Sequence, residues 1–402
     1  ERSVPELEYA FKHVLTQEAT YQGILENQRK AFHLLVAQGI ERLYRAHIEE
    51  YYEELAHHYS WSERKDKALE YQLKSAEKAK KQYANETAIE FYKKALEVAS
   101  GMGDETNPQR VEIYESLGRI YDLIGRRQNA QEAYTKGLES CSDRRKRTRL
   151  YLHLEGCVDD RKLKEHYLNL AKETLGDDTN SPEMASIYCT LSRRAWNDGE
   201  PILALETAQK GLELVKDTDN FEEIVALCDA ANWFSIWVTD SEDVPNMYAQ
   251  IAYDAAKRSG DRGLISHAML LLQRASGIND ESTFLENIEI YKMIGNLKQV
   301  IHNYAYLHFC YLNKAEQEKA VQALREGIAL SRRMEAQEEG SSGGWLKWCL
   351  YGLGRIYAES GNVEMVEKWS EELLRPSHPA PLPEGEGSRE DPHDLFYLNA
   401  LT

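Results

Sequence analysis

The stretch that decides the fold is VEIYESLGRIYDLIGRRQNAQEAYTKGL, residues 111–138. Counted from Val111 as position 1, large side chains stand at positions 4, 7, 11 and 24, and small residues at positions 8, 20 and 27. The large ones are Tyr114, Leu117, Tyr121 and Tyr134, and the small ones are Gly118, Ala130 and Gly137. Small residues let two helices approach closely, while large ones fill the space between them. The stretch therefore predicts two antiparallel helices that pack as a hairpin and are separated near Gly125.

The same spacing returns in frames that begin at Ala185, Ile301 and Lys347, and weaker copies fill the intervals. This pattern resembles the tetratricopeptide repeat, in which each helical hairpin stacks on the next. The resemblance implies an all-α fold, a right-handed α-solenoid of about eight hairpins over residues 46–375. A single hairpin is too small to stand alone, so neighbouring hairpins must share a core.

The composition of the whole chain excludes several classes of function. The 402 residues carry a formal net charge of −18, which repels phosphate backbones, so we expect no nucleic-acid partner. No uncharged apolar stretch reaches the roughly 18 residues of a membrane helix, and the first residues lack the pattern of a signal peptide. We therefore expect no membrane partner. The six cysteines contain no CxxC pair, which favours reduced core residues in a cytoplasmic protein.

The two ends of the chain differ from the repeats. The run LEYAFKHV, residues 7–14, alternates in the manner of a short strand and leads into a helix near Leu15. After Arg375 the segment PSHPAPLPEGEGSREDP has the composition of a flexible linker. Beyond it, only residues 395–401 are apolar enough to dock onto another surface.

The first hundred residues carry a second likeness. The runs EYAFKHVLTQEATYQGIL (8–25) and QRKAFHLLVAQGIERLY (28–44), with LAHHY (55–59), resemble a junction in bacterial signalling proteins with a STAND-type or AAA-like ATPase. The match is closest to proteins in which an adenylate or guanylate cyclase domain precedes that ATPase. The resemblance implies a winged-helix remnant and connecting helix over residues 1–45, repeats over 46–375, and a linker with a short tail over 376–402. Residues 11–13 would end the winged helix, and residues 55–59 would open the repeats.

No catalytic motif accompanies this likeness. A nucleotide site of that family needs a GxxxxGK[ST] loop, whose backbone amides and lysine hold the phosphates. The nearest imitation, GSSGGWLK at residues 340–347, has Trp345 where the lysine should follow the glycine. The adjacent His57 and His58 point about 100 degrees apart on a helix, which does not suit one metal ion. We therefore predict no catalytic residue, no cofactor and no metal in this chain.

Candidate binding residues come from the first helix of each repeat. In tetratricopeptide proteins, positions 2, 5, 9, 12 and 13 of that helix line a concave groove that binds peptides. Guanidinium groups pair with carboxylates, and aromatic rings bury large areas, so these types suit an extended or carboxylate-bearing peptide. The predicted partner-binding residues are Arg119, Arg193, Trp196, Asn197, Phe309, Asn313, Trp348, Tyr351 and Arg355. The alternative is that each arginine pairs with a carboxylate of its own or the adjacent repeat, as Glu115 could with Arg119.

Two further clusters allow a functional and a structural interpretation. The basic run Arg144, Arg145, Lys146, Arg147 and Arg149 could bind an acidic partner or RNA. We favour a solvated helix start that complements neighbouring carboxylates. The three rings of Trp233, Phe234 and Trp237 could form an exposed partner patch. There we favour packing between neighbouring repeats.

These features predict a non-catalytic arm for protein interaction and sensing in a larger cytoplasmic signalling ATPase or nucleotide cyclase. Its partners would be a protein or peptide in the concave groove and the upstream ATPase or cyclase domains, which the arm would regulate. The alternative is the effector arm of an ATPase-type transcription activator whose DNA-binding domain is missing from this chain. The short Pro-rich segment after Arg375 leaves no room for such a domain within this sequence.

Overall fold

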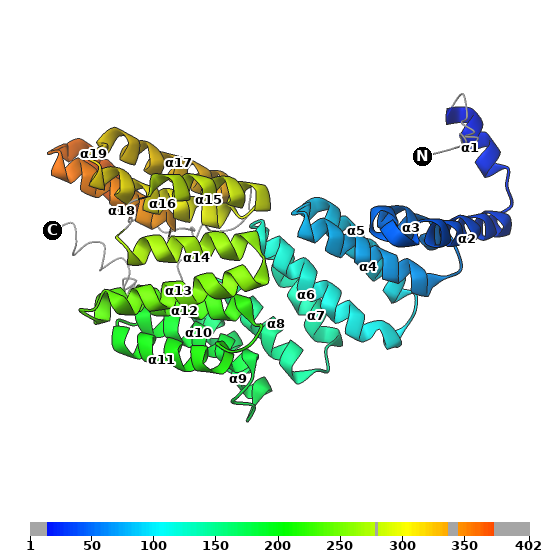
Figure 1. The fold of residues 1–402 in the computed structure, drawn as a ribbon, viewed down its shortest axis with the longest axis horizontal. Helices are drawn as coiled ribbons and strands as arrows, with labels where there is room; N and C mark the ends of the chain where they lie inside the picture. The colour runs from blue at the N-terminus through cyan, green and yellow to red at the C-terminus, as the bar shows by residue number, and fades with distance from the viewer. Residues whose placement is uncertain (1–13, 278–279, 337–344, 374–402) are drawn as a thin grey trace, which may run out of the picture. The chain divides into compact units, whose positions relative to one another are not determined.

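The computed structural model describes residues 14–277, 280–336 and 345–373, and within these ranges the chain forms helices and no strand (Figure 1). Consecutive helices pack as hairpins that follow one another along the chain, which confirms the predicted all-α array of tetratricopeptide-like repeats. The strand predicted at residues 7–14 lies outside the described residues except for Val14, which begins a helix. The linker and tail predicted at residues 376–402 also lie outside them.

The chain divides into two compact units, Glu1–Ile113 and Tyr114–Thr402, with the division inside helix α6. The boundary at residue 45 that the sequence indicates stays a prediction. The N-terminal unit contains α1 (Val14–Gln22), α2 (Glu26–Leu43), η1 (Arg45–Tyr51), α3 (Tyr52–Ser60), α4 (Lys65–Lys81), α5 (Asn85–Ser100), η2 (Asp104–Thr106) and the start of α6 (Asn107–Leu123).

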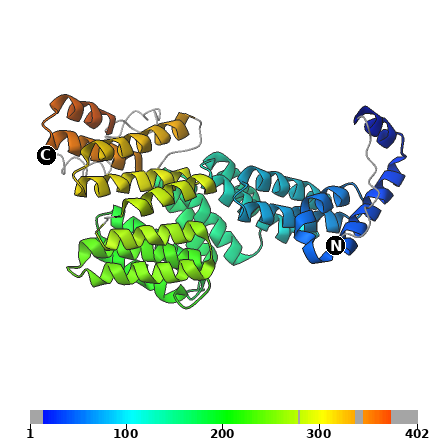
Figure 2. The same ribbon diagram turned by 45° about the horizontal axis from the view of Figure 1, so that its top comes forward.

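The C-terminal unit holds the rest of α6 and most of the hairpins, and its helices form successive pairs in both views (Figures 1 and 2). Its helices are α7 (Arg127–Ser140), α8 (Arg144–Cys157), α9 (Arg161–Leu175), α10 (Pro182–Asn197), α11 (Pro201–Val215), α12 (Phe221–Val238), α13 (Asp243–Ser259), α14 (Arg262–Ala275), α15 (Glu281–Ile294), α16 (Leu297–Asn313), α17 (Gln317–Ala336), α18 (Trp345–Glu359) and α19 (Val363–Leu373).

The turns inside four of the hairpins repeat one backbone geometry. Position 15 has a positive φ at Gly125 (85°), Gly199 (80°) and Gly361 (69°), and the following amide donates to the carbonyl five residues back. This is the helix ending that a left-handed residue provides, and glycine adopts it without steric cost. In the frame that begins at Ile301 the same position holds Ala315, with φ 59° and the same bond from Glu316 N to Tyr311 O at 2.9 Å.

We expect Ala315→Gly to stabilise the C-terminal unit by about 1 kcal/mol, because a residue with a Cβ pays that cost in the left-handed region. Urea unfolding monitored by circular dichroism measures the change. The reverse substitution, Gly125→Ala, should destabilise the unit by a similar amount. An Ala315→Gly protein with an unchanged or lower midpoint would contradict this account of the turn.

Close approach of helices explains the small residues at positions 8 and 27. A Cβ built on Gly118 in α6 would overlap the ring of Tyr134 in α7, and one built on Gly211 would lie 2.7 Å from Leu227 Cδ2. Tyr134 is almost fully buried. The hairpin therefore packs ring against backbone, as the spacing of Gly118 and Tyr134 predicts.

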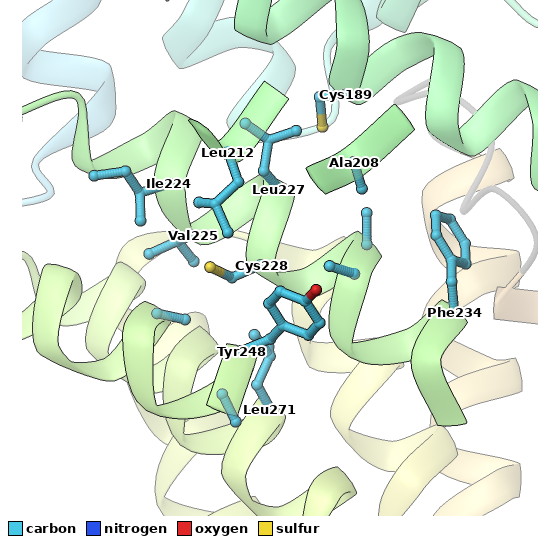
Figure 3. Packing of buried hydrophobic residues seen from close by; sticks show 14 of the residues in the cluster. Cys189, Ala208, Leu212, Ile224, Val225, Leu227, Cys228, Phe234, Tyr248 and Leu271 are labelled. Atoms are coloured by element: carbon cyan, nitrogen blue, oxygen red, sulfur yellow. The ribbon is translucent and has the colours of Figure 1, made fainter. Parts of the chain in front are cut away.

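The core of the C-terminal unit runs continuously across several hairpins (Figure 3). Cys189 of α10, Leu212 of α11, Leu227 of α12, Tyr248 of α13 and Leu271 of α14 belong to one buried cluster. Each apolar side chain that leaves water contributes about 1.5–3 kcal/mol when fully buried. Because one cluster spans five helices, these hairpins depend on one another for stability.

Candidate binding surface on the inner helices

The predicted binding residues lie on the first helix of successive hairpins in the C-terminal unit, which we call the inner helices α6, α8, α10, α12, α14, α16 and α18. Neighbouring inner helices contact one another directly, as α10 does with α12 and α16 with α18. Position 9 is occupied by Arg119 on α6, Arg193 on α10, Phe309 on α16 and Arg355 on α18. The repeat spacing thus places these four side chains on equivalent parts of their helices.

Ion pairs tie the arginine of α6 to another hairpin. Nη2 of Arg119 lies 2.5 and 2.6 Å from the two carboxylate oxygens of Glu222, in the first turn of α12. Glu115 bonds instead to Arg149 of α8, at 2.9 Å from Nε, and Arg149 also reaches Glu183 of α10 at 2.8 Å. Arg119 thus pairs with a carboxylate, as the alternative interpretation expects, but Glu115 is the wrong partner, and Glu222 belongs neither to the repeat of Arg119 nor to the adjacent one.

A second ion pair starts one turn further along α6. Asp122 accepts from Nζ of Lys298, in the first turn of α16, at 2.9 Å. The partners are 176 residues apart in the chain. Helix α6 is therefore joined by charged contacts to the beginnings of both α12 and α16, and its arginine is engaged within the protein.

The basic run at residues 144–149 lies at the start of a helix and contacts neighbouring carboxylates, which agrees with the structural interpretation of this run. Arg145 pairs with Asp178 at 2.9 Å, Arg149 joins two carboxylates as described, and Arg147 donates to the carbonyls of Leu138 and Cys141. The run forms the first turns of α8, and the side chain of Asp143 caps this helix by accepting a hydrogen bond from the backbone amide of Lys146. It is a helix start that engages neighbouring carboxylates and carbonyls.

Arg193 has a different environment from Arg119. Its side chain is exposed, and its guanidinium donates to the carbonyl oxygen and Sγ of Cys189, one turn earlier on α10, at 3.4 and 3.2 Å. Within the described part of the chain no carboxylate forms an ion pair with it. An exposed guanidinium without a carboxylate is available to an anionic group.

Aromatic rings from four inner helices form a connected group that begins at Trp196, one turn after Arg193 on α10. We call Trp196, Trp233, Trp237, Phe309, Trp348 and Tyr351 the aromatic cluster. Trp196 stacks on the buried ring of Phe234 at 5.0 Å between centroids and lies 6.1 Å from Trp233. Trp233 of α12 reaches Trp348 of α18 at 6.5 Å, and Trp348 lies at the same separation from Phe309. The structure thus brings together Trp196, Phe309, Trp348 and Tyr351, four of the predicted residues.

The cluster is partly buried and partly open to solvent. Phe234 is buried in the core, which agrees with packing between repeats, whereas the side chain of Trp237 is 56% exposed. Arg355 lies over the ring of Phe309 at 5.9 Å and pairs with Glu359. Asn197 and Asn313 are exposed last residues of α10 and α16. Binding of a partner by these predicted residues stays a prediction.

A buried ion pair behind the cluster was not predicted. Arg274 of α14, whose side chain is 6% exposed, donates to Asp229 at 2.6 Å and to Asn232 at 2.6 Å, both on α12. It also lies under the ring of Trp233 at 5.4 Å. Burial alone would raise the pKa of Asp229, but Arg274 and His267 outweigh it and hold that pKa well below its usual value. The signal in the sequence was an arginine within the apolar run MLLLQRA, residues 269–275.

The described residues hold no group of three or more His, Cys, Asp or Glu side chains placed to bind a metal ion. All six cysteines are buried and unbridged, and burial raises the pKa of Cys157, Cys228 and Cys349 to about 12. Thiols with such a pKa are poor nucleophiles at neutral pH. No described helix is long and apolar enough to cross a membrane.

A histidine pair links the first helices of the N-terminal unit. Nδ1 of His33 on α2 lies 2.8 Å from Nδ1 of His58 on α3, and Nε2 of His33 lies 2.7 Å from the hydroxyl of Tyr21. One ring must donate and the other accept, so the bond between them is lost when both are protonated. Burial, with the neighbouring charges of His58, His57 and Arg29, lowers the pKa of His33, and burial with the charge of His57 lowers the pKa of His58.

We expect the packing of α2 on α3 to weaken as the pH falls below about 6.5, the ordinary histidine pKa. A folded-state pKa below the unfolded value means that the unfolded chain binds protons more readily, so stability is lost on acidification. Hydrogen exchange of peptides from α2 and α3, corrected for the intrinsic effect of pH, measures this. His33→Gln should flatten the response, whereas His166→Gln, at an exposed position of α9, should not. An unchanged response in His33→Gln would disprove the assignment.

Comparison with known proteins agrees with the repeat architecture. A tetratricopeptide-repeat family model matches residues 111–144, the stretch from which the fold was predicted. No curated protein matches the chain significantly. Arrays of such repeats form extended binding surfaces for other proteins.

Two solved structures that match over most of this chain have low sequence identity and low TM-scores. One is a STAND protein, a signal-transduction ATPase with numerous domains and a tetratricopeptide-repeat sensor, from Pyrococcus horikoshii, with 14% identity over 90% of this chain and a TM-score of 0.44. This chain spans 54% of that protein's length. The tetratricopeptide domain of P58(IPK) has 12% identity, 88% and 98% coverage of the two chains and a TM-score of 0.20.

Proposed function

We propose that this chain is a non-catalytic interaction and sensor arm that binds an extended peptide on its inner helices. The peptide would place a carboxylate on Arg193 and a neighbouring apolar side chain on the aromatic cluster. Through this binding the arm would regulate an ATPase or nucleotide cyclase module that precedes it in the same polypeptide.

The observation that carries the proposal is the contrast between Arg193 and Arg119. Arg119 holds both oxygens of Glu222, so binding an external carboxylate there would require breaking an existing ion pair. Arg193 is exposed one turn before the half-buried ring of Trp196, and its hydrogen bonds within the described residues go to Cys189 of its own helix. In a chain of net charge −18, such a site attracts an acidic peptide locally while the rest of the surface repels it.

Helix α2 supports the second part of the proposal, which is contact with a preceding module. Phe32, Leu35 and Val36 are exposed on one side of α2, and Leu35 is the most exposed of the three at 62%. Positions i, i+3 and i+4 of a helix share a face. An apolar face of this kind is typical of a protein interface, and it lies in the region that resembles a winged-helix remnant and its connecting helix.

Selection from a random peptide library displayed on phage tests the binding surface. We expect enriched peptides to carry Asp or Glu next to Pro, Leu or an aromatic residue, and to bind Arg193→Ala at least tenfold more weakly, which corresponds to about 1.4 kcal/mol. The matched control is Arg258→Ala, an exposed arginine of α13 that pairs with Asp219. Equal binding to the Arg193→Ala protein would reject the site.

The non-catalytic part has its own test. Purified chain should not hydrolyse ATP and should not form cyclic nucleotide from ATP or GTP with magnesium present. Turnover by the chain alone, retained after gel filtration and absent from a mock purification, would overturn the proposal that it is a regulatory arm.

A further inference from the structure

We infer that the aromatic cluster is the docking site of the chain's own segment 391–401, DPHDLFYLNAL. This inference rests on the proposed binding surface, and it names an occupant of that surface within the same polypeptide. The docked segment would compete with any partner peptide. The arm would then bind its partner only by displacing its own tail.

The surface has the apolar character that such a segment needs. Its rings come from α10, α12, α16 and α18, and they remain incompletely covered by the described residues. Trp237, at the end of α12, is the most exposed, and Ile236 beside it is 37% exposed. Aromatic rings that keep contact with water gain free energy, roughly 25 cal/mol per Å², when a further apolar side chain covers them.

The topology brings the tail to this surface. Helices α18 and α19 form an antiparallel hairpin, so the end of α19 at Leu373 lies beside the beginning of α18. Trp348 stands in the first turn of α18 and belongs to the cluster. Packed helices are about 8–10 Å apart. Residues 374–390, which separate α19 from the segment, number 17, and a random-coil chain of that length spans roughly 20–25 Å on average.

The chemistry of the segment matches the surface. Its apolar part contains Leu395, Phe396 and Tyr397, which suit a surface of tryptophan and phenylalanine rings. Asp394 directly precedes that part, and Asp391 lies three residues earlier. Arg193 on the same helix as Trp196 forms no ion pair with a described carboxylate, so a carboxylate of the segment can pair with it directly.

Docking in cis has a measurable consequence for binding in trans. When a competing segment occupies the site for most of the time, the apparent affinity for an external ligand falls in proportion to the free fraction. A tail that occupies the site in nine molecules out of ten would weaken an external peptide about tenfold. Substitutions that release the tail should therefore strengthen peptide binding without any change in the surface.

Crosslinking within the full chain tests the inference. Asn399→Cys is combined with Asn197→Cys, which is exposed next to Trp196, and a short bismaleimide is added at neutral pH. The native cysteines are buried, so the two introduced thiols should react first. The control combines Asn399→Cys with Glu289→Cys, at a highly exposed position on α15, the second helix of its hairpin. We expect the Asn197 pair to form monomeric crosslinked product at least fivefold faster.

A further variant separates docking from chance collision. This variant carries Leu395→Ser, Phe396→Ser and Leu398→Ser in the tail. These changes should slow crosslinking between Asn399→Cys and Asn197→Cys to the rate of the control pair. The same three changes should strengthen binding of a phage-selected peptide several-fold. Equal crosslinking rates for the two cysteine pairs, or no effect of the serine substitutions, would overturn the inference. Peptide binding that is still weakened by Arg193→Ala would in that case leave the proposed function standing. Loss of both would reject the binding surface itself.

Discussion

Arg274→Met should destabilise the C-terminal unit by about 3 kcal/mol, because removing one partner leaves a buried charge uncompensated. The guanidinium of Arg274 is almost fully buried and serves Asp229, Asn232 and the face of Trp233 together. The side chain of Asp229 keeps some contact with solvent, so we take the lower end of the range for a broken buried pair. Urea unfolding at pH 7, followed by circular dichroism, measures the effect.

Two comparisons make this prediction specific. Arg258→Met removes an arginine that is 52% exposed and pairs with Asp219, which is 85% exposed, so it should change stability by less than about 0.5 kcal/mol. Combining Arg274→Met with Asp229→Asn should recover part of the loss, since no charge is then left behind. A loss as small as that of Arg258→Met would show that the buried pair does not hold α12 and α14 together.

The same pair predicts how stability changes with pH. The folded-state pKa of Asp229 is lowered, so its contribution is present above the ordinary aspartate value of about 3.9 and is lost as the pH falls below it. This acid-dependent part should disappear in Asp229→Asn. Persistence of the full dependence would place it on other carboxylates.

Gly118→Ala should destabilise the C-terminal unit by about 3 kcal/mol, at the upper end for overpacking of a core. The added methyl would overlap the ring of Tyr134, and that ring is enclosed on its other sides, so the two helices must separate. Thermal unfolding followed by circular dichroism measures the loss. We expect the pair of α6 and α7 to exchange amide hydrogens faster than α10 and α11 in this variant.

The matched control is Gly156→Ala in α8. A Cβ built there meets no atom within 4 Å, so this change should stabilise by roughly 0.5 kcal/mol through the better helix propensity of alanine. If both substitutions had the same sign, the close approach at Gly118 would not be the cause.

The repeat spacing determined the hairpins in advance because their packing is local. Gly118 and Tyr134 are sixteen residues apart on two adjacent helices, so the pattern of small and large residues carries the contact directly. Even the turn geometry follows, because Gly125, Gly199 and Gly361 recur at one position. The left-handed Ala315 at the equivalent position shows that the fold imposes this conformation where the residue type alone would not.

The inner surface depends on contacts that no local pattern contains. Position 9 falls on the first helix of its hairpin at both Arg119 and Arg193, but only the stacking of hairpins decided that Arg119 meets Glu222, 103 residues away, while Arg193 forms no ion pair with a described carboxylate. The sequence by itself determined the helices and their pairing, since those follow from spacings within a single repeat. The tertiary structure alone decided which charges of these helices form ion pairs and which rings gather, because these depend on the angle at which distant hairpins meet.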